Sequence, residues 1–561
     1  MTLQKQYLKY RFIKSVLFLG LLFFSKDILA QEKLNFIWPI DSPFIITGNY
    51  GELRPNHFHA GIDFSTNGKI NLPIYCIEEG YISRIRISPY GYGKSVYITH
   101  PNGKVSLYAH LNAYSLKVAN LAKENQYTSQ NYEIDFMLKP RTAYVRRNEI
   151  IGLSGNTGSS TGPHLHFEIR DELSEMPLNP LSFYKINDHT SPELNSIAFY
   201  NLSDTTSPKL ITTKKIKKGR GDTLILDGDH ITLNYSIIGI AFSGLDRCYY
   251  NGNPNNIYSA QMYLNNNLIY EHKLNNISFD DSRYINEFSE TIGKQKYQKC
   301  FLPTIYPLGL FGTCYDKGRI NLKESEFQKI KLVFTDESGN ASPLEFYLKT
   351  KRIDEYVIPE EKSNLYVNCS SPFVSFTDNL YTYIPEKTFF YSKNIVISNT
   401  LNDNGKLSIF PDLNLKQMVT LGFKVPEKYA GFGDKLILDG SSNAISLARN
   451  DSVFYQVKSF GKFQLRIDTI PPKIKIDHSE HQLKEAWQLD AFSFSIKDEM
   501  SGIGKYNLWL NNEWVLAEYD AKTDLLTYYF DYDTPMGLLN FKLEVIDKVG
   551  NRAFLEYVLK K

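Results

Sequence analysis

The sequence of 561 residues has few cysteines, no charge surplus and almost no long apolar run. Its five cysteines form no CxxC pair and are too sparse for a disulfide scaffold, which excludes a cysteine-based zinc site. Cys300 and Cys314 could pair to close a short loop, although an odd total leaves at least one thiol free. Lys+Arg 63 against Asp+Glu 61 leaves a net charge of +2, so no basic field indicates a nucleic acid as partner.

The only long apolar run lies near the N-terminus and covers residues 16–24. It is too short for a membrane-spanning helix, which needs about 20 residues. Lys and Arg side chains precede it, and Ala30 offers a small residue at which cleavage could occur, so residues 1–30 are interpreted as a signal peptide rather than an anchor or a buried helix. We therefore expect export to the periplasm, the cell envelope or the extracellular space, with no membrane span after signal removal.

Aromatic residues are abundant, at 14% of the chain with 39 Tyr and 35 Phe, and such side chains favour strands. The length predicts three to four domains. We expect an all-β chain, in which an antiparallel β-sheet domain is followed by several β-sandwich domains. The expected division is a signal peptide at 1–30, a first domain at 36–188, a β-sandwich with an insertion at 190–352, a β-rich domain of unknown role at 353–466 and a last β-sandwich at 467–561.

The first domain shows short apolar strands separated by Gly, Pro and Asn turns. Asn102-Gly103 between two apolar runs is a strong hairpin signal, because both residues tolerate positive φ. Residues 116–126 break this pattern and predict a short helix inserted between strands.

The chain after the first domain contains a repeat. Tyr-Leu-Asn-Asn at 263–266 is echoed by Trp-Leu-Asn-Asn at 509–512, and Asp336 to Asn340 is echoed by Asp547 to Asn551. Two copies of one β-sandwich unit are the economical interpretation. The Asp-x-x-Gly-Asn turn ahead of a final strand resembles bacterial immunoglobulin-like modules.

Histidine is concentrated in the first domain, where six of the eleven lie between residues 57 and 166. His164 and His166 lie in a strand-like run and so share one face, while His59 and Asp63 supply an imidazole and a carboxylate four residues apart. Three such ligands with a water make the open tetrahedral site of a catalytic zinc. A fourth histidine, His110, makes a chance arrangement a poor explanation.

These motifs resemble one family. Arg54, His59-Ala-Gly-Ile-Asp63, Tyr-Ala-His110-Leu and the run Gly155 to Glu168, which contains Pro-His164-Leu-His166, are similar to the lysostaphin-type (LytM) zinc endopeptidases of peptidoglycan. The resemblance covers about residues 40–185. It implies one Zn²⁺ held by His59, Asp63 and His166, and catalytic roles for His110 and His164 in proton transfer and transition-state charge.

The resemblance implies an exported zinc metalloendopeptidase that hydrolyses peptide cross-links or stem peptides of peptidoglycan. The chain has no HExxH helix, so a histidine is expected to replace the glutamate base of helical zinc proteases, and the sequence leaves open which of His110 and His164 is that base. The alternative is a non-catalytic or latent cell-wall binding protein that regulates a separate hydrolase. A third interpretation makes the β-sandwich half an adhesion module.

Four further features receive provisional roles. Glu168 shares a strand face with His166 and is expected to orient it. His57 is expected at the surface, and His100 is expected to be structural. The segment 155–162 lacks the lysine of a phosphate-binding loop and is expected to form a turn at the rim of the metal cleft.

Overall fold

The computed structural model describes residues 36–561, apart from short gaps at 42–43, 204–207, 220–222, 229, 248–253, 324–325, 352–364, 378–379, 399–404, 441–443, 446, 450–451 and 532–533. The expected signal peptide and Cys248 lie outside the described residues. Helices are few and short, and strands make up most of the regular structure, so the all-β prediction is confirmed.

The N-terminal part, residues 36–188, is built on a large antiparallel sheet in the order β1-β4-β13-β8-β7-β6-β10. Strand β11 adds to β6 and β14 to β13, while β5-β12-β9 and β2-β3 form two smaller sheets. The strands are β1 (Ile46–Gly48), β2 (Leu53–Arg54), β3 (His57–Phe58), β4 (Ile62–Ser65), β5 (Pro73–Tyr75), β6 (Gly80–Ile87), β7 (Lys94–Thr99), β8 (Lys104–Leu111), β9 (Ala113–Tyr114), β10 (Ile134–Met137), β11 (Tyr144–Val145), β12 (Ile150–Leu153), β13 (His164–Asp171) and β14 (Pro177–Leu178).

The helix expected over 116–126 is confirmed as α2 (Leu116–Ser129). Val118, Ala122 and Gln126 form its buried face. It ends at Gln130, which adopts the left-handed conformation that commonly terminates helices. A short 3₁₀ turn, η1 (Pro180–Phe183), then closes this part of the chain.

The second part, residues 190–352, forms one 13-stranded sheet in the order β22-β23-β19-β15-β16-β17-β27-β26-β20-β21-β24, with β18 beside β27 and β25 beside β19. Its strands are β15 (Glu193–Asn201), β16 (Lys209–Lys218), β17 (Leu224–Leu226), β18 (His230–Leu233), β19 (Ile237–Leu245), β20 (Ser259–Leu264), β21 (Asn267–Lys273), β22 (Ser289–Ile292), β23 (Gln295–Lys299), β24 (Phe311–Cys314), β25 (Ile320–Asn321), β26 (Gln328–Thr335) and β27 (Ala341–Thr350). The insertion after β21 carries helical turns at η3 (Phe279–Tyr284), α3 (Ile285–Phe288), η4 (Leu308–Leu310) and η5 (Tyr315–Gly318).

The third part, described from residue 365 to 467, is a nine-stranded sheet around the long strands β32 and β36. Its strands are β28 (Leu365–Val367), β29 (Phe373–Thr377), β30 (Leu380–Ile384), β31 (Lys393–Ser398), β32 (Lys406–Lys424), β33 (Leu436–Asp439), β34 (Ala444–Ile445), β35 (Leu447–Arg449) and β36 (Ser452–Ile467), with 3₁₀ turns η6 (Glu427–Tyr429) and η7 (Gly433–Lys435).

The C-terminal part, residues 467–561, has two four-stranded sheets, β37-β38-β42-β41 and β40-β39-β43-β44. They share a core in which the rings of Phe492 and Phe541 lie 4.8 Å apart. Its elements are β37 (Lys473–Ile476), α4 (Glu480–Lys484), η8 (Ala486–Gln488), β38 (Ala491–Lys497), β39 (Ile503–Leu510), β40 (Glu513–Val515), β41 (Glu518–Asp520), β42 (Leu525–Tyr529), β43 (Leu538–Asp547) and β44 (Arg552–Lys560).

The two repeated Asn-Asn pairs form the same turn. Asn265 and Asn266 join β20 to β21 with φ of 48° and 70°, and Asn511 and Asn512 join β39 to β40 with φ of 50° and 72°. Two consecutive positive φ angles are typical of the type I′ hairpin turn. The repeat is therefore local structure as well as sequence, while the immunoglobulin-like assignment and the domain boundaries stay predictions.

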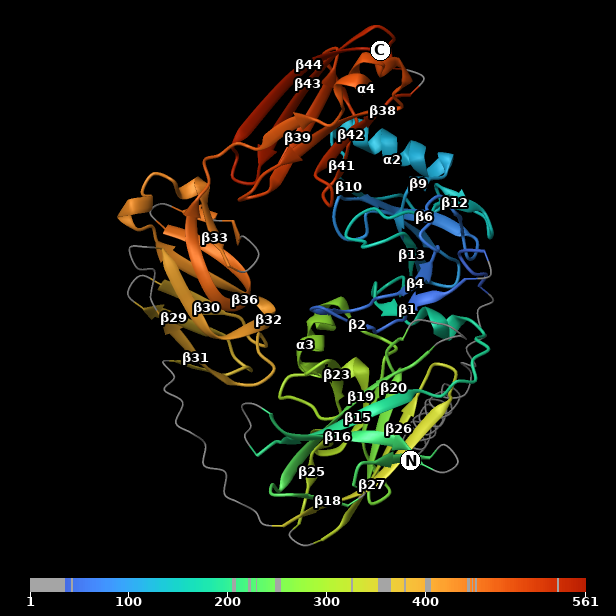
Figure 1. Ribbon diagram of the computed structural model, residues 1–561, viewed down its shortest axis with the longest axis vertical. Coiled ribbons are helices and arrows are strands. Elements are labelled where there is room, and N and C mark those ends of the chain that lie inside the picture. The colour runs from blue at the N-terminus through green and yellow to red at the C-terminus, as the bar shows by residue number, and fades with distance from the viewer. Residues whose placement is uncertain are drawn as a thin grey trace, which may run out of the picture.

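The four parts follow one another around a ring, and the C-terminal part returns to the N-terminal part beside α2 (Figure 1). Polar contacts hold each junction. Tyr50 donates to Pro177 and accepts from Ile277 of the second part, Lys416 pairs with Asp281, Lys435 donates to Val549, and Lys94 pairs with Glu518 at 2.8 Å.

Cys300 and Cys314 are free thiols, so the short loop that they could have closed is not cross-linked. Cys300 is fully buried in the core of the second part, and the Cys314 thiol lies 3.9 Å from the Glu271 carbonyl oxygen instead. Within the described residues, no helix has the length and apolar character needed to cross a membrane.

Candidate functional site

Strand pairing brings the expected metal ligands together. In the antiparallel pair of β13 and β4, His166 lies directly opposite Asp63, and His59 precedes β4 by three residues. His166 Nδ1 is 2.9 Å and His59 Nε2 is 3.1 Å from Asp63 Oδ1. All three side chains are buried, and their candidate ligand atoms lie within 4.8 Å of one another. The structure therefore groups the three predicted ligands at one point.

The second ring nitrogen of each ligand histidine is also occupied. His59 Nδ1 lies 2.9 Å from the carbonyl oxygen of Asn49, and His166 Nε2 lies 2.8 Å from Glu168 Oε1. These contacts orient the two rings, so that His59 Nε2 and His166 Nδ1 face Asp63 Oδ1 and lie 2.9 Å from each other. This is the usual arrangement around metal-binding histidines, in which a carbonyl or carboxylate fixes the ring.

Glu168, expected as an orienting residue, is fully buried and well supported. Arg170 Nε donates to its Oε2 at 2.7 Å, and the Tyr92 hydroxyl donates to its Oε1. Burial alone would raise the pKa of Glu168, but Arg170 and His166 lower it to about 2. Glu168 is therefore a carboxylate, and it can hold the His166 ring in one orientation.

Arg54 contacts the ligand group from the opposite side. Its Nη2 donates to Asp63 Oδ2 and to Glu52 Oε2, the latter at 2.9 Å. Burial acts to raise the pKa of Asp63, but His59 and His166 hold it well below its usual range. Arg54 thus fixes the Asp63 oxygen that does not face the histidines. The sequence placed Arg54 within the family motif but did not indicate this role.

The two expected catalytic histidines lie beside the ligands. His110, at the end of β8, has its ring centre 4.7 Å from that of His164 and 5.9 Å from that of His166. His110 Nδ1 lies 2.8 Å from the Thr157 carbonyl oxygen, and His164 Nδ1 lies 2.9 Å from the Gly162 carbonyl oxygen. Both Nδ1 atoms therefore carry protons, which leaves both Nε2 atoms with lone pairs.

Burial, together with the neighbouring His166 and His164, lowers the pKa of His110 to about 3. His110 is therefore neutral at neutral pH, the form required to accept a proton. Its φ of 58° coincides with an irregularity in the pairing of β8 with β7, where Tyr108 lies opposite Val96 and Leu111 opposite Lys94. The His164 side chain is the more exposed of the two, and its Nε2 lies 3.6 Å from Asp63 Oδ1.

Three further sequence predictions concern the segment 155–162, His57 and His100. The segment 155–162 runs beside the metal ligands and supplies both carbonyls that orient the catalytic histidines. His57 is exposed, whereas His100 is buried with its two ring nitrogens bound to the Glu79 carbonyl and the Ser106 hydroxyl. The expectation that neither joins the site agrees with this geometry.

The C-terminal part contacts the rim of the site. Lys522 Nζ donates to the carbonyl oxygen of Asn156 and lies 3.4 Å from that of Ser160. A cavity of about 790 Å³ opens between these residues and strands β41 and β42. No sequence motif indicated this contact, because it joins residues more than 360 positions apart.

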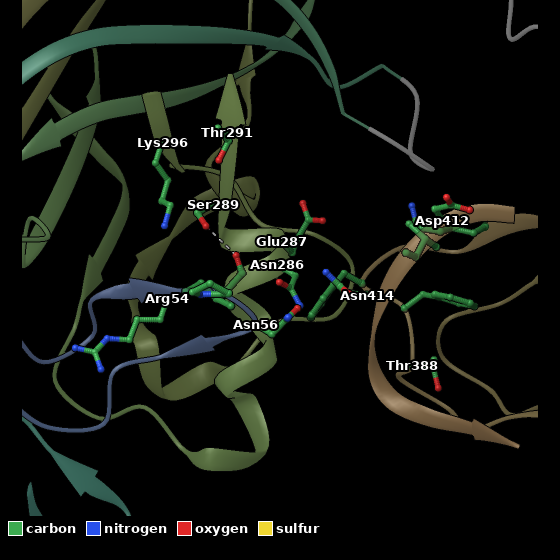
Figure 2. A pocket seen from close by; sticks show the side chains of 16 residues that line it. Arg54, Asn56, Asn286, Glu287, Ser289, Thr291, Lys296, Thr388, Asp412 and Asn414 are labelled. Atoms are coloured by element: carbon green, nitrogen blue, oxygen red, sulfur yellow. Dashed lines mark hydrogen bonds between the residues drawn. The ribbon is translucent and has the colours of Figure 1, made fainter. Parts of the chain in front are cut away.

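A second cavity, of about 440 Å³, opens beside Arg54 where hairpin β2–β3, helix α3 and strand β32 meet. Figure 2 shows the side chains of Asn56, Asn286 and Asn414 gathered there from these three parts of the chain. Arg54 lines this cavity, and its guanidinium group contacts Asp63.

Comparisons with known proteins match the N-terminal part. The model of Peptidase family M23 matches residues 57–130 and 121–180. The DD-carboxypeptidase/endopeptidase Mpg of Neisseria meningitidis is 36% identical over 124 residues, which are 22% of each chain. The peptidoglycan DD-endopeptidase ShyA of Vibrio cholerae is 33% identical over 138 residues, 24% of this chain and 26% of its own. The match thus spans about a quarter of these relatives.

Among solved structures, the catalytic domain of the prophage-encoded M23 protein EnpA from Enterococcus faecalis is 26% identical. The alignment covers 26% of this chain and 95% of that domain, with a TM-score of 0.20 over the whole chain. On the sequence matches, the N-terminal part is a peptidase domain of the LytM type.

Proposed function

We propose that the chain uses its LytM-type domain as an exported zinc metalloendopeptidase, which hydrolyses peptide bonds in the cross-links or stem peptides of peptidoglycan. The observation that carries the proposal is the convergence of His59, Asp63 and His166, with the free Nε2 atoms of His110 and His164 beside them. Inactive members of such a family would be expected to lack some of these five residues, and here all five are present in one group.

The ligand group fits zinc. Two neutral imidazoles and one carboxylate are a common donor set for a catalytic zinc, which keeps its fourth position for water or substrate. Each histidine has its second nitrogen fixed, by Asn49 or by Glu168, so its ligating nitrogen is already oriented. When bound, zinc would lower the pKa of a water and polarise the scissile carbonyl.

We assign proton acceptance to His110. Its Nδ1–H donates to Thr157, so Nε2 can take a proton from the attacking water. The water oxygen then bonds to the carbonyl carbon, and the proton held on His110 passes to the amide nitrogen as the C–N bond breaks. The ring of His164 is oriented by the Gly162 carbonyl and lies beside His110. We assign His164 to stabilising the negative charge that develops on the carbonyl oxygen.

The substrate class is proposed from the relatives. Mpg and ShyA carry names that describe peptidoglycan or DD-peptide cleavage, and the matched segment is the domain that holds the site. Peptidoglycan lies outside the cytoplasm, which agrees with the export expected from residues 1–30.

The test is to incubate the chain from residue 31 with purified peptidoglycan and to identify the released muropeptides by mass spectrometry. The proposal predicts cleavage of peptide bonds that is lost with a chelator and in His110→Ala. Intact peptidoglycan after treatment with a folded, zinc-loaded chain would contradict it.

A latent form of this enzyme is the second candidate. Lys522 of the C-terminal part contacts the loop that orients His110, so this part is placed to restrain the site. In that case the full chain would be inactive, and release of the C-terminal part would start cleavage.

A further inference from the structure

A cluster of three aspartates lies outside the peptidase site, where the N-terminal part joins the second part. Asp188 precedes β15, Asp246 follows β19 and Asp336 follows β26. These strands belong to one sheet (Figure 1). The three side chains are 8%, 0% and 2% exposed, and one carboxylate oxygen from each lies within 4.8 Å of the others.

Two side chains in this cluster lack partners. Neither carboxylate oxygen of Asp246 has a hydrogen-bond partner in the described part of the chain, and neither does the amide oxygen or nitrogen of Asn255, which is only 5% exposed. The backbones of these two residues exchange hydrogen bonds of 3.0 and 2.8 Å. Directly opposite residues of an antiparallel pair project from the same face, so the Asn255 side chain lies on the same face as the Asp246 carboxylate.

No basic side chain of the described residues offsets the negative charge of the three aspartates. Across the described ranges, no Lys or Arg forms an ion pair with any of the three aspartates, and the nearby Arg247 pairs with Glu193. The oxygens of Asp336 accept from the backbone and side-chain amides of Asn340, and Asp188 accepts from the Thr190 amide. Burying several carboxylates with one fully unpartnered is unfavourable unless a cation joins them.

We propose that Asp188, Asp246 and Asp336, with the amide oxygen of Asn255, form a binding site for one Ca²⁺ ion, separate from the peptidase metal. All of its donors are oxygens, which calcium prefers and which suit zinc less than nitrogen or sulfur. Calcium takes six to eight oxygen ligands in flexible geometry, whereas magnesium demands a strict octahedron and retains its waters. A crowded, buried set of carboxylates and an amide therefore favours calcium.

The second copy of the repeat provides an internal comparison. Asp468, Asp498 and Asp547 occupy the equivalent positions, and Asn551 donates to Asp547 and Asp468 as Asn340 does to Asp336 and Asp188. Asp498, the counterpart of Asp246, accepts from the amides of Met500 and Gly502. The carboxylate that lacks partners in the first copy is thus satisfied by backbone in the second, so the proposal is confined to the first.

The position of the site gives the ion a structural role. Asn255 precedes Asn256, whose carbonyl oxygen accepts from the Asn49 side chain and whose own side chain donates to Gly51. The Asn49 carbonyl in turn orients His59. An ion that fixes Asn255 would therefore steady the junction beside the peptidase ligand. This consequence rests on the proposed function, but the ion site itself does not.

Calcium uptake by the full mature chain tests the proposal. The protein is first loaded with zinc, so that the peptidase ligands are occupied, and calcium is then titrated by calorimetry. We expect one site with a dissociation constant of about 10⁻⁴–10⁻³ M, the range of extracellular modules. Asp246→Asn should weaken it at least about tenfold, whereas the matched Asp498→Asn should leave it unchanged.

Calcium should also raise the melting temperature of the wild type and of Asp498→Asn, but not that of Asp246→Asn. If Asp246→Asn fails to fold, Asn255→Ala, which retains the backbone pairing, serves in its place. No uptake by the wild type, or equal uptake by Asp246→Asn or its substitute, would overturn the proposal. Neither calcium uptake nor the melting temperature depends on turnover, so failure of the calcium-site proposal is distinguishable from failure of the proposed peptidase function.

Discussion

His166 lies directly opposite Asp63 across the antiparallel pair of β13 and β4, and its Nδ1 is 2.9 Å from Asp63 Oδ1. The two residues are 103 positions apart, so the sheet register alone brings them together. A shift of one residue in that register would turn His166 to the other face and separate it from Asp63. The ligand group therefore depends on the fold of the whole sheet.

Removal of a ligand should release the metal, whereas removal of a catalytic histidine should not. We expect His59→Ala and Asp63→Ala to lose zinc, because each removes one of three protein donors. His110→Ala should retain one zinc but lose turnover by about 10²–10⁴-fold, the usual contribution of a general base. Metal analysis of the purified variants, with activity on the same samples, makes the comparison.

The control for these variants is His57→Ala, since His57 is exposed and lies outside the ligand group. It should retain both zinc and activity. Equal zinc loss in His59→Ala, Asp63→Ala and His110→Ala would contradict the division of roles.

Glu168 should act on the metal through His166. In Glu168→Gln the carboxylate that accepts from His166 Nε2 is replaced by a neutral amide, so the ring is held less firmly. Loss of such an orienting partner typically lowers metal affinity by 10–100-fold. Zinc competition with a chromophoric chelator measures the affinity, and Glu172→Gln, at an exposed position, is the matched control. An unchanged zinc affinity would contradict the orienting role of Glu168.

The effect of Lys522→Ala on activity distinguishes an active full chain from a latent one. Its contacts with the Asn156 and Ser160 carbonyls steady the loop whose Thr157 carbonyl orients His110. If this contact only positions the loop, Lys522→Ala should lower kcat several-fold while zinc content stays the same.

A latent enzyme predicts the opposite, since removal of the contact would free the site and raise activity. Steady-state kinetics on soluble muropeptides separates these outcomes. Lys497→Ala, an exposed lysine in the same part of the chain, should change neither kcat nor zinc content.

Acid should destabilise the second part through His272. This side chain is fully buried, and burial lowers its pKa to about 3. The unfolded chain protonates His272 near pH 6.5, so the folded state binds fewer protons. Its stabilising contribution is complete above about pH 6.5 and is lost as pH falls toward 3, at up to about 1.4 kcal/mol per pH unit.

Scanning calorimetry at pH 7 and pH 4.5 tests this expectation. His272→Phe, which cannot be protonated, should lose about 3 kcal/mol less stability than the wild type over that interval. His481→Phe, at an exposed position, should behave as the wild type does. An equal acid response in wild type and His272→Phe would contradict the assignment.

Much of the site could be predicted because its chemistry is local in sequence. The alternation of a strand places His164 and His166 on one face, and the apolar spacing over 116–126 predicted helix α2, which extends to Ser129. Asn102-Gly103 predicted the hairpin of β7 and β8 because both residue types tolerate positive φ, and Gly103 has a φ of 73° there.

The supporting contacts could not be predicted, because they depend on which segments the fold brings together. The backbone carbonyls of Asn49, Thr157 and Gly162 orient histidines without any side-chain signature. Arg54 stood in the motif, yet only the turn at β2 and β3 directs it to Asp63. The contact of Lys522 with the Asn156 loop requires the ring arrangement of the four parts.

The most direct test uses a defined peptide-cross-linked muropeptide dimer and the zinc-loaded mature chain. Turnover is followed by mass spectrometry, and zinc is measured on the same sample. We predict one zinc per chain and release of products with one new amino and one new carboxyl end, with His110→Ala equally loaded but inactive. An intact dimer beside a folded, fully loaded wild-type chain would contradict the account.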